Sequence, residues 1–370
     1  MTCSGRWAPR PNRGAAQQRG HHLVPAVIRK GNRTVPRPSP VTLAQIARRA
    51  GVHVSTVSRS LAANSTGVGS STVARVRAIA AEMGYFRDPA ATTLRTGRSG
   101  VLGILMPRLT DYVLARIFEG ADEAAHGVGY TTVVASTNDD PGLRIERLDN
   151  LLARRVEGLI IGDARLDGDE LVKSLDRRGV PYVLVNRRLR GHLSVTTDDV
   201  LGGQLAGEHM LELGHTAMGV VAGPDYASTC VERTHGFVGR ALSAGIPFPD
   251  SCVQTSGADV EGGHEAANAL LTRHPELTAI FAINDFAAIG AMGAAREHGR
   301  TPGRDIAIIG YNDIPLARFL PVPLSSVSSP MAEMGHRGAL ALNELIAGRP
   351  AEPELLTPRL CPRDSTVAVR

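Results

Sequence analysis

The sequence predicts a small all-α module followed by an α/β body of two lobes, each with a doubly wound parallel sheet. Residues 41–83 carry three short helical patterns, and from Val101 onward apolar strand-like runs alternate with amphipathic helical runs. Charge divides in the same way: of a total of +5, residues 1–40 contribute +8, residues 41–99 contribute +6 and residues 100–370 contribute −9. A basic front end joined to an acidic body suggests two separate tasks.

Residues 1–40 are rich in Arg, Pro, Gly and Gln, and their apolar residues show no periodicity. This composition predicts a disordered basic extension. Two interpretations remain open: an arm that adds nonspecific phosphate contacts, or a dispensable extension that arises from an upstream start codon. We favour the second.

The all-α module begins at Thr42, a good helix N-cap, and its first helix ends at Gly51. After the turn Gly51-Val52-His53, a second helix is predicted to turn Val54, Val57 and Leu61 inward. Its outward positions are Ser55, Thr56, Ser58 and Arg59. A third helix from Ser70 or Ser71 to Gly84 is predicted to bury Val73, Val76, Ile79 and Ala80.

Two helices joined by a short Gly-containing turn form a helix-turn-helix, whose second helix enters the major groove of DNA. The alternative is a three-helix packing module with a solvated basic face. The net charge of +6 over residues 41–99 favours DNA binding, because basic side chains neutralise phosphates.

The run TLAQIARRAGVHVSTVSRSL, followed by V-x-x-x-T-x-x-R-V and Met83-Gly84-Tyr85, resembles the headpiece of the LacI/GalR family of bacterial repressors. The resemblance extends from Val41 to about Thr366. It implies a type I periplasmic-binding-protein-like body that binds a small effector, a homodimer, and a pseudo-palindromic DNA operator. Two departures are visible: His53 replaces a usual Ser N-cap, and the loop before Val68 is one residue longer than usual.

The resemblance places Val54, Ser55 and Arg59 on the base-reading face. The chemistry agrees, because arginine can donate to both guanine O6 and N7, and valine can contact a thymine methyl. Positions suited to phosphate contacts are Thr42, Thr56, Ser58 and Thr72.

Residues 86–99 are predicted to form a short helix and linker, with Asp88 as N-cap, Pro89 at the first position and Gly97 as terminator. The resemblance implies a hinge that folds on operator DNA and places Leu94, with Ala91, at the minor groove. An apolar wedge there kinks the duplex. The alternative is a linker whose Leu94 packs on the body.

The body, residues 100–370, is predicted to divide into lobe 1 (about 100–197 and 329–349) and lobe 2 (about 198–328 and 350–370). Predicted strands are Val101–Met106, Tyr130–Ala135, Leu159–Ile161, Tyr182–Val185, Met218–Ala222, Ala279–Ala282 and Ile306–Gly310. Predicted helices are Ala115–Ala125, Leu143–Ala153, Glu170–Arg178, Gly203–Leu213, Glu232–Ala244, Gly263–Thr272, Phe286–His298 and Met331–Ile346.

Ligands of such sheets bind outside the carboxyl ends of the strands. Candidates at those ends are Val113, Asp163, Asn186, Asn284 and Asn312. Amides suit a hydroxyl-rich ligand such as a sugar, although a helix N-cap is an equally good interpretation of Asn284. The resemblance adds Thr229 and Arg233, the latter as the residue that grips the effector. Asn186 and Asn312 stand where many family members carry Asp, which disfavours a strongly cationic effector.

The sequence shows no catalytic motif, no metal-ligand spacing among Cys3, Cys230, Cys252 and Cys361, and no apolar run long enough to span a membrane. We therefore predict a cytoplasmic, effector-responsive repressor without a cofactor. The alternatives are a solute-binding protein, a sugar sensor without specific operator binding, and a sugar-metabolising enzyme. The absence of a secretory signal disfavours the first of these.

Overall fold

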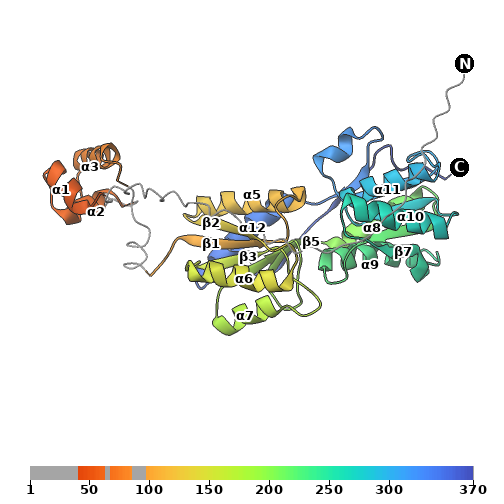
Figure 1. Cartoon of the computed structure of the whole chain (residues 1–370), viewed down its shortest axis with the longest axis horizontal. Helices are drawn as coiled ribbons and strands as arrows, with labels where there is room; N and C mark the ends of the chain where they lie inside the picture. The colour runs from red at the N-terminus through yellow and green to blue at the C-terminus, as the bar shows by residue number, and fades with distance from the viewer. Residues whose placement is uncertain (1–40, 63–66, 86–96, 370) are drawn as a thin grey trace, which may run out of the picture. The chain divides into compact units, whose positions relative to one another are not determined.

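The computed structural model describes residues 41–62, 67–85 and 97–369 (Figure 1). The predicted extension and the predicted hinge residues Ala91 and Leu94 lie outside the described residues. The chain divides into two compact units with the boundary between Arg87 and Asp88, and each unit is described by itself.

The first unit contains α1 (Leu43–Ala50), α2 (Val54–Ser60) and α3 (Ser70–Glu82). Thr42 and Gln45 form a capping box at α1: the Thr42 side chain accepts from the Gln45 backbone N–H, and Gln45 Oε1 accepts from the Thr42 N–H at 2.8 Å. Gly51 ends α1 in the left-handed conformation, with φ of 64°. The predicted helix-turn-helix geometry is thereby confirmed.

Ile46, Val57 and Val76 are fully buried and join the three helices. The prediction that Val54 points inward is wrong, because its side chain is 39% exposed. Helix α2 is only seven residues long, and the residues that it buries, Val57 and Ser60, lie one and two turns after Val54. The first turn of α2 is therefore left available to a partner.

The sheet of lobe 1 is entirely parallel, in the order β11-β5-β4-β3-β1-β2. Its strands are β1 (Val101–Met106), β2 (Thr131–Ser136), β3 (Gly158–Ile161), β4 (Tyr182–Val185), β5 (Ser194–Thr197) and β11 (Glu354–Leu356). Figure 1 shows helices covering both faces of this sheet. One face carries α5 (Tyr112–Gly127) and α12 (Met331–Ile346), and the other carries α6 (Pro141–Ala153) and α7 (Glu170–Arg178).

The sheet of lobe 2 has the order β12-β10-β9-β8-β6-β7 and is parallel except for β12, which runs antiparallel to β10. Its strands are β6 (Met218–Ala222), β7 (Val253–Thr255), β8 (Ala279–Ala282), β9 (Ala307–Asn312), β10 (Ser325–Ser328) and β12 (Arg359–Cys361). Helices α8 (Asp199–Glu212) and α9 (Ser228–Ser243) pack together on one face, and α10 (Val260–Arg273) and α11 (Asp285–Glu297) on the other.

The described chain crosses between the lobes after β5, after β10 and after β11. The last crossing corrects the predicted boundary, which assigned residues 350–370 to lobe 2. Strand β11 instead pairs with β5 in lobe 1, and Leu356 O accepts from Asp198 N at 2.9 Å. Three extended segments therefore join the lobes.

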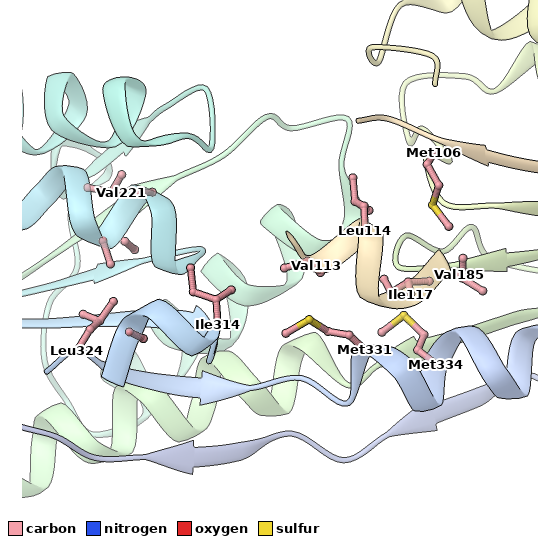
Figure 2. Packing of buried hydrophobic residues seen from close by; sticks show 14 of the residues in the cluster. Met106, Val113, Leu114, Ile117, Val185, Val221, Ile314, Leu324, Met331 and Met334 are labelled. Atoms are coloured by element: carbon pink, nitrogen blue, oxygen red, sulfur yellow. The ribbon is translucent and has the colours of Figure 1, made fainter. Parts of the chain in front are cut away.

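The core of lobe 1 forms where α5 meets α12. Figure 2 shows Val113 and Ile117 of α5 together with Met331 and Met334 of α12, all buried in one apolar cluster. The two helices approach closely because glycines face backbone: a Cβ on Gly335 would lie 1.9 Å from Ile117 O. Helix α12 therefore completes lobe 1 although it lies near the end of the chain.

Two buried histidines attach the C-terminal segment to lobe 2. His209 Nε2 lies 2.8 Å from Thr366 Oγ1, and His215 Nε2 lies 2.8 Å from Val367 O. Burial lowers the pKa of both imidazoles. The unfolded chain therefore binds protons before the folded chain does, so these groups reduce the free energy of unfolding as pH falls below about 6.5.

We expect a His209→Gln/His215→Gln variant to lose less stability than the parent between about pH 7 and pH 5.5, measured by urea denaturation. Asp285 contributes with the opposite sign, because burial raises the pKa of its carboxyl to about 7 and the folded state then holds its proton longer. The difference between parent and variant isolates the histidines, since Asp285 is present in both. Equal losses would show that these imidazoles do not govern the acid response.

Candidate functional site

A cavity of about 120 Å³ lies between the lobes and is lined by both. The predicted residues that line it are Val113 and Asn186 from lobe 1 and Thr229, Arg233, Asn284 and Asn312 from lobe 2. Ligand pockets commonly measure ~300–1,000 Å³. The cavity in this closed arrangement therefore suits a small ligand, and a larger one requires the lobes to separate.

The asparagines converge because each follows or ends a parallel strand: Asn186 follows β4, Asn284 follows β8, and Asn312 ends β9. Asn186 and Asn312 have positive φ angles of 63° and 100°. Such backbone is costly for residues other than glycine, and it is common at ligand sites.

Arg233 is held in place by the protein itself. Its Nε donates to Asp199 Oδ1 at 2.7 Å, its Nη1 donates to Ile283 O at 2.8 Å, and its guanidinium lies 3.7 Å from the ring centroid of Tyr311. Burial raises the pKa of the Asp199 carboxyl, and the Arg233 guanidinium opposes that shift. The cavity wall thus contains an oriented cation whose charge is already balanced.

Two buried polar atoms of the lining have no hydrogen-bond partner in the described part of the chain: Asn312 Oδ1 and Arg187 Nε. The terminal nitrogens of Arg187 bind Asp139 in a bidentate pair at 2.7 and 2.8 Å. Buried groups of this kind normally find partners. An acceptor and a donor are therefore available on the cavity wall.

Both polar side-chain atoms of Asn284 are hydrogen-bonded to the backbone of lobe 2. Its Oδ1 accepts from Ala287 N at 2.7 Å and caps α11, and its Nδ2 donates to Ala258 O at 2.7 Å. The helix N-cap interpretation therefore accounts for the polar atoms of Asn284, although the residue lines the cavity.

Asp163 does not reach the cavity. It is fully buried inside lobe 1, where Oδ2 accepts from Thr137 Oγ1 at 2.5 Å and lies 3.1 Å from Arg144 Nε. Arg144 also binds Asp169 at 2.8 Å. The strand-end pattern predicted the position of Asp163 correctly but not its direction, because the buried cation on α6 draws the carboxylate into the lobe.

Other lining residues were missing from the predicted set, among them Asp111, Asp139 and Tyr226. Each lies in the loop after a strand, namely β1, β2 and β6. The strand-end rule could have found them, because it applies to every loop that follows a parallel strand.

A groove of about 620 Å³ lies nearby and shares Asn312 with the cavity. Its charged side chains are satisfied by one another or by neighbours: Arg318 binds Asp313 at 3.1 Å, and Glu333 binds Arg337 at 2.5 Å. The smaller cavity is the better candidate for a ligand site, because it adds the unpaired Arg187 Nε to the shared Asn312 Oδ1.

In the helical unit, Val54, Ser55 and Arg59 of α2 are exposed, and Arg59 Nε donates to Ser55 O at 3.3 Å. Ser55 and Arg59 lie one turn apart and share a face. Thr42 is exposed at the start of α1, whereas Thr56, Ser58 and Thr72 are partly buried.

Family models match both units. One, described as "Bacterial regulatory proteins, lacI family", matches residues 42–88, and another, "Periplasmic binding proteins and sugar binding domain of LacI family", matches residues 99–355. The chain belongs to the LacI family. It is a DNA-binding transcriptional regulator with an effector-binding domain, and this family is non-enzymatic. The predicted fold, a helix-turn-helix headpiece with a type I periplasmic-binding-protein-like body, is confirmed.

Relatives support this membership along most of the chain. The chain is 32% identical to the transcriptional regulator CelR of Thermobifida fusca, over 84% of this chain and 94% of that protein. It is 30% identical to the regulator DegA of Bacillus subtilis, over 88% and 98%. A solved lac repressor dimer bound to operator and the anti-inducer ONPF has a TM-score of 0.81 at 26% identity, covering 89% of this chain and all of that one. A CelR–cellobiose complex has a TM-score of 0.69 at 29% identity, with the same coverage.

Among the described residues, none of the helices has the length and apolar character needed to span a bilayer. Within that same part of the chain, no group of three or more His, Cys, Asp or Glu residues could hold a metal ion.

Proposed function

We propose that this LacI-family regulator binds a pseudo-palindromic operator as a homodimer, and that a small hydroxyl-rich effector, a sugar or related metabolite, changes its operator affinity from the cavity between the lobes. The observation that carries the proposal is the cavity wall, where a fixed guanidinium, an unpaired Asn312 Oδ1 and an unpaired Arg187 Nε meet. Two solved relatives are described as complexes, CelR with cellobiose and the lac repressor with ONPF.

The lining suits sugar hydroxyls, because a hydroxyl both donates and accepts and can serve Asn312 Oδ1 and Arg187 Nε alike. Asn186 and Thr229 add an amide and a hydroxyl. The carboxylate of Asp139 is bound by Arg187, so a strongly cationic effector would have to compete with that pair. We therefore favour a neutral effector.

On DNA, Val54, Ser55 and Arg59 of α2 would read base edges, and Thr42, Thr56, Ser58 and Thr72 would contact phosphates. Support comes from the exposure of the three base-reading side chains and from the first turn of α2, which the headpiece core leaves uncovered. The proposed minor-groove roles of Leu94 and Ala91 rest on the resemblance alone. A regulator that acts on chromosomal DNA would work in the cytoplasm.

The effector would act by binding two arrangements of the lobes with different affinity. A coupling of about 1–3 kcal/mol between effector and operator is usual for such systems. In a dimer, a change in lobe orientation alters the spacing of the two headpieces, and each headpiece must meet its own half-site.

A DNA-binding titration of the purified protein on its own upstream region, repeated with a panel of sugars and related metabolites, tests the proposal. Salt-sensitive, site-specific binding that one compound alters is expected. If that region holds no site, selection from a random DNA pool is the next step. Absence of any specific site in that pool would overturn operator binding, and specific binding that no compound alters would count against the effector class.

Arg59→Ala should weaken specific operator binding by about 1–3 kcal/mol and leave nonspecific binding nearly unchanged, because a base contact is lost. Arg75→Ala is a matched control, since Arg75 is an exposed arginine on α3 outside the reading helix. Titrations on operator and on scrambled DNA at one salt concentration measure both effects. Equal losses on the two DNAs would contradict a base-reading role for Arg59.

A further inference from the structure

We propose that an interlobe clasp centred on Tyr226 stabilises the closed cleft independently of the effector and so gates the cavity. The clasp consists of Arg165, Leu166, Arg187 and Arg188 from lobe 1 and Tyr226, Ser228 and Glu232 from lobe 2. The gating role rests on the proposed function of the cavity, whereas the closure itself is a property of the protein alone.

Tyr226 is both a wall of the cavity and a link to the opposite lobe. The Arg165 guanidinium lies 3.8 Å from its ring centroid, and that of Arg187 lies 5.5 Å away. The backbone O of Tyr226 accepts from Leu166 N at 2.9 Å. A guanidinium within about 6 Å of an aromatic ring is attracted by its quadrupole. Tyr226 therefore binds two neighbouring residues of lobe 1, Arg165 through its ring and Leu166 through its backbone.

A second pair of contacts lies in the first two turns of α9, which begins just after Tyr226. Arg188 Nε donates to Glu232 Oε1 at 2.8 Å, and Arg188 N donates to Ser228 Oγ at 2.9 Å. The two charged side chains are 29% and 21% exposed, so water screens this pair less than a fully exposed one. Side-chain and backbone donors of Arg188 thus hold the first two turns of α9 against lobe 1.

The clasp is also tied to the cavity wall. Arg165 Nη1 donates to Asp139 O at 3.2 Å, and the Asp139 carboxylate binds Arg187, which lines the cavity beside Asn186. Separating Tyr226 from Arg165 and Arg187 would therefore loosen the wall that an effector would contact. A ligand that reorients Arg187 would in turn weaken the clasp.

Every contact of the clasp joins protein to protein, so it contributes to closure whether or not the cavity is filled. A ligand larger than the cavity of about 120 Å³ can enter only when the lobes separate, and that separation breaks the clasp. Gating of this kind slows both entry and release, because each requires the same opening. Weakening the clasp should therefore accelerate exchange more than it changes affinity.

The test measures the distance between the lobes in the full-length protein without any ligand. Spin labels are attached through Lys173→Cys on α7 and His235→Cys on α9, both exposed and outside the clasp. The parent chain carries Cys3→Ser and Cys361→Ser, and Cys230 and Cys252 are buried. Pulsed electron resonance then gives the distribution of distances. A single narrow population is expected for the parent.

Tyr226→Ala should add a longer population and raise the open-to-closed ratio about tenfold, because both guanidinium contacts are lost. Tyr226→Phe is the matched control: it keeps the ring and should keep the narrow distribution. Glu232→Gln tests the second contact with little change in shape and should open the cleft in the same direction. Raising NaCl from about 0.1 to 1 M should shift the parent the same way, since the Debye length falls from ~10 to ~3 Å.

A parent that is already broad and long, or a Tyr226→Ala distribution that superimposes on that of Tyr226→Phe, would overturn the clasp. Circular dichroism of each labelled variant establishes that it is folded. Since no effector enters the measurement, a failed clasp leaves the proposed sugar-type effector untouched. Conversely, a panel without any active compound leaves these distances valid.

Discussion

Arg233→Ala should abolish the effector response and destabilise the body by about 3–5 kcal/mol, the usual cost of breaking a buried ion pair. The large cost arises because Asp199 would remain buried without its cation, and an uncompensated buried charge is far more costly than the loss of the pair. The response is lost because the variant lacks the oriented guanidinium on the cavity wall. Urea denaturation measures stability, and operator titration with and without the active compound measures the response.

Arg233→Met combined with Asp199→Asn separates these two effects. It removes both charges, so it should recover much of the stability while the effector response stays absent. Operator binding should be retained in both variants, because the headpiece is a separate compact unit. A single variant that still responds normally would remove Arg233 from the effector site.

Arg144→Met should destabilise lobe 1 by at least about 3–5 kcal/mol, because one cation serves two buried carboxylates. Asp163 and Asp169 would then repel each other without a counter-charge. Adding Asp163→Asn and Asp169→Asn should restore much of the loss, since an Asn at 169 can still cap α7 through its oxygen. Urea denaturation of the single and triple variants provides the comparison.

The same series tests the assignment of Asp163. With Arg144 present, Asp163→Asn should leave effector affinity unchanged, because the side chain is fully buried away from the cavity. A loss of stability below about 1 kcal/mol in Arg144→Met would contradict the structural role of this network.

The apolar strands could be predicted from sequence, whereas the polar ones could not. Val101–Met106, Tyr182–Val185 and Met218–Ala222 have the predicted bounds, because runs of buried aliphatic residues are distinctive. Strands β5 (Ser-Val-Thr-Thr) and β10 (Ser-Ser-Val-Ser) each have a single apolar residue among hydroxyl residues, a composition that resembles a loop. Strand β10 can be buried because distant groups satisfy its hydroxyls: Ser326 Oγ donates to Asp285 Oδ1 at 2.6 Å, for example. Asp285 lies 41 residues before Ser326 in the sequence, so no local sequence pattern can predict this contact.

The candidate site divides in a similar way. The rule of strand carboxyl ends brought Asn186 and Asn312 together correctly, since it depends only on parallel topology. The rule could not predict that the Asp163 side chain points into lobe 1, toward Arg144 on α6. It also could not predict that Tyr226 contacts the opposite lobe. Side-chain direction depends on packing between segments far apart in the sequence.

The three crossings between the lobes have a consequence for synthesis on the ribosome. The headpiece helices end at Glu82, so the ribosome completes this unit early. The apolar face of α5 stays uncovered until α12, which starts at Met331, has been synthesised. Neither sheet is complete before β11 and β12, at residues 354–361. The nascent body therefore exposes unpaired strand edges and apolar surface until translation is almost finished, a state that favours aggregation and chaperone binding. A premature stop codon shortly before residue 354 should accordingly release a chain whose headpiece is folded and whose two sheets each lack a strand.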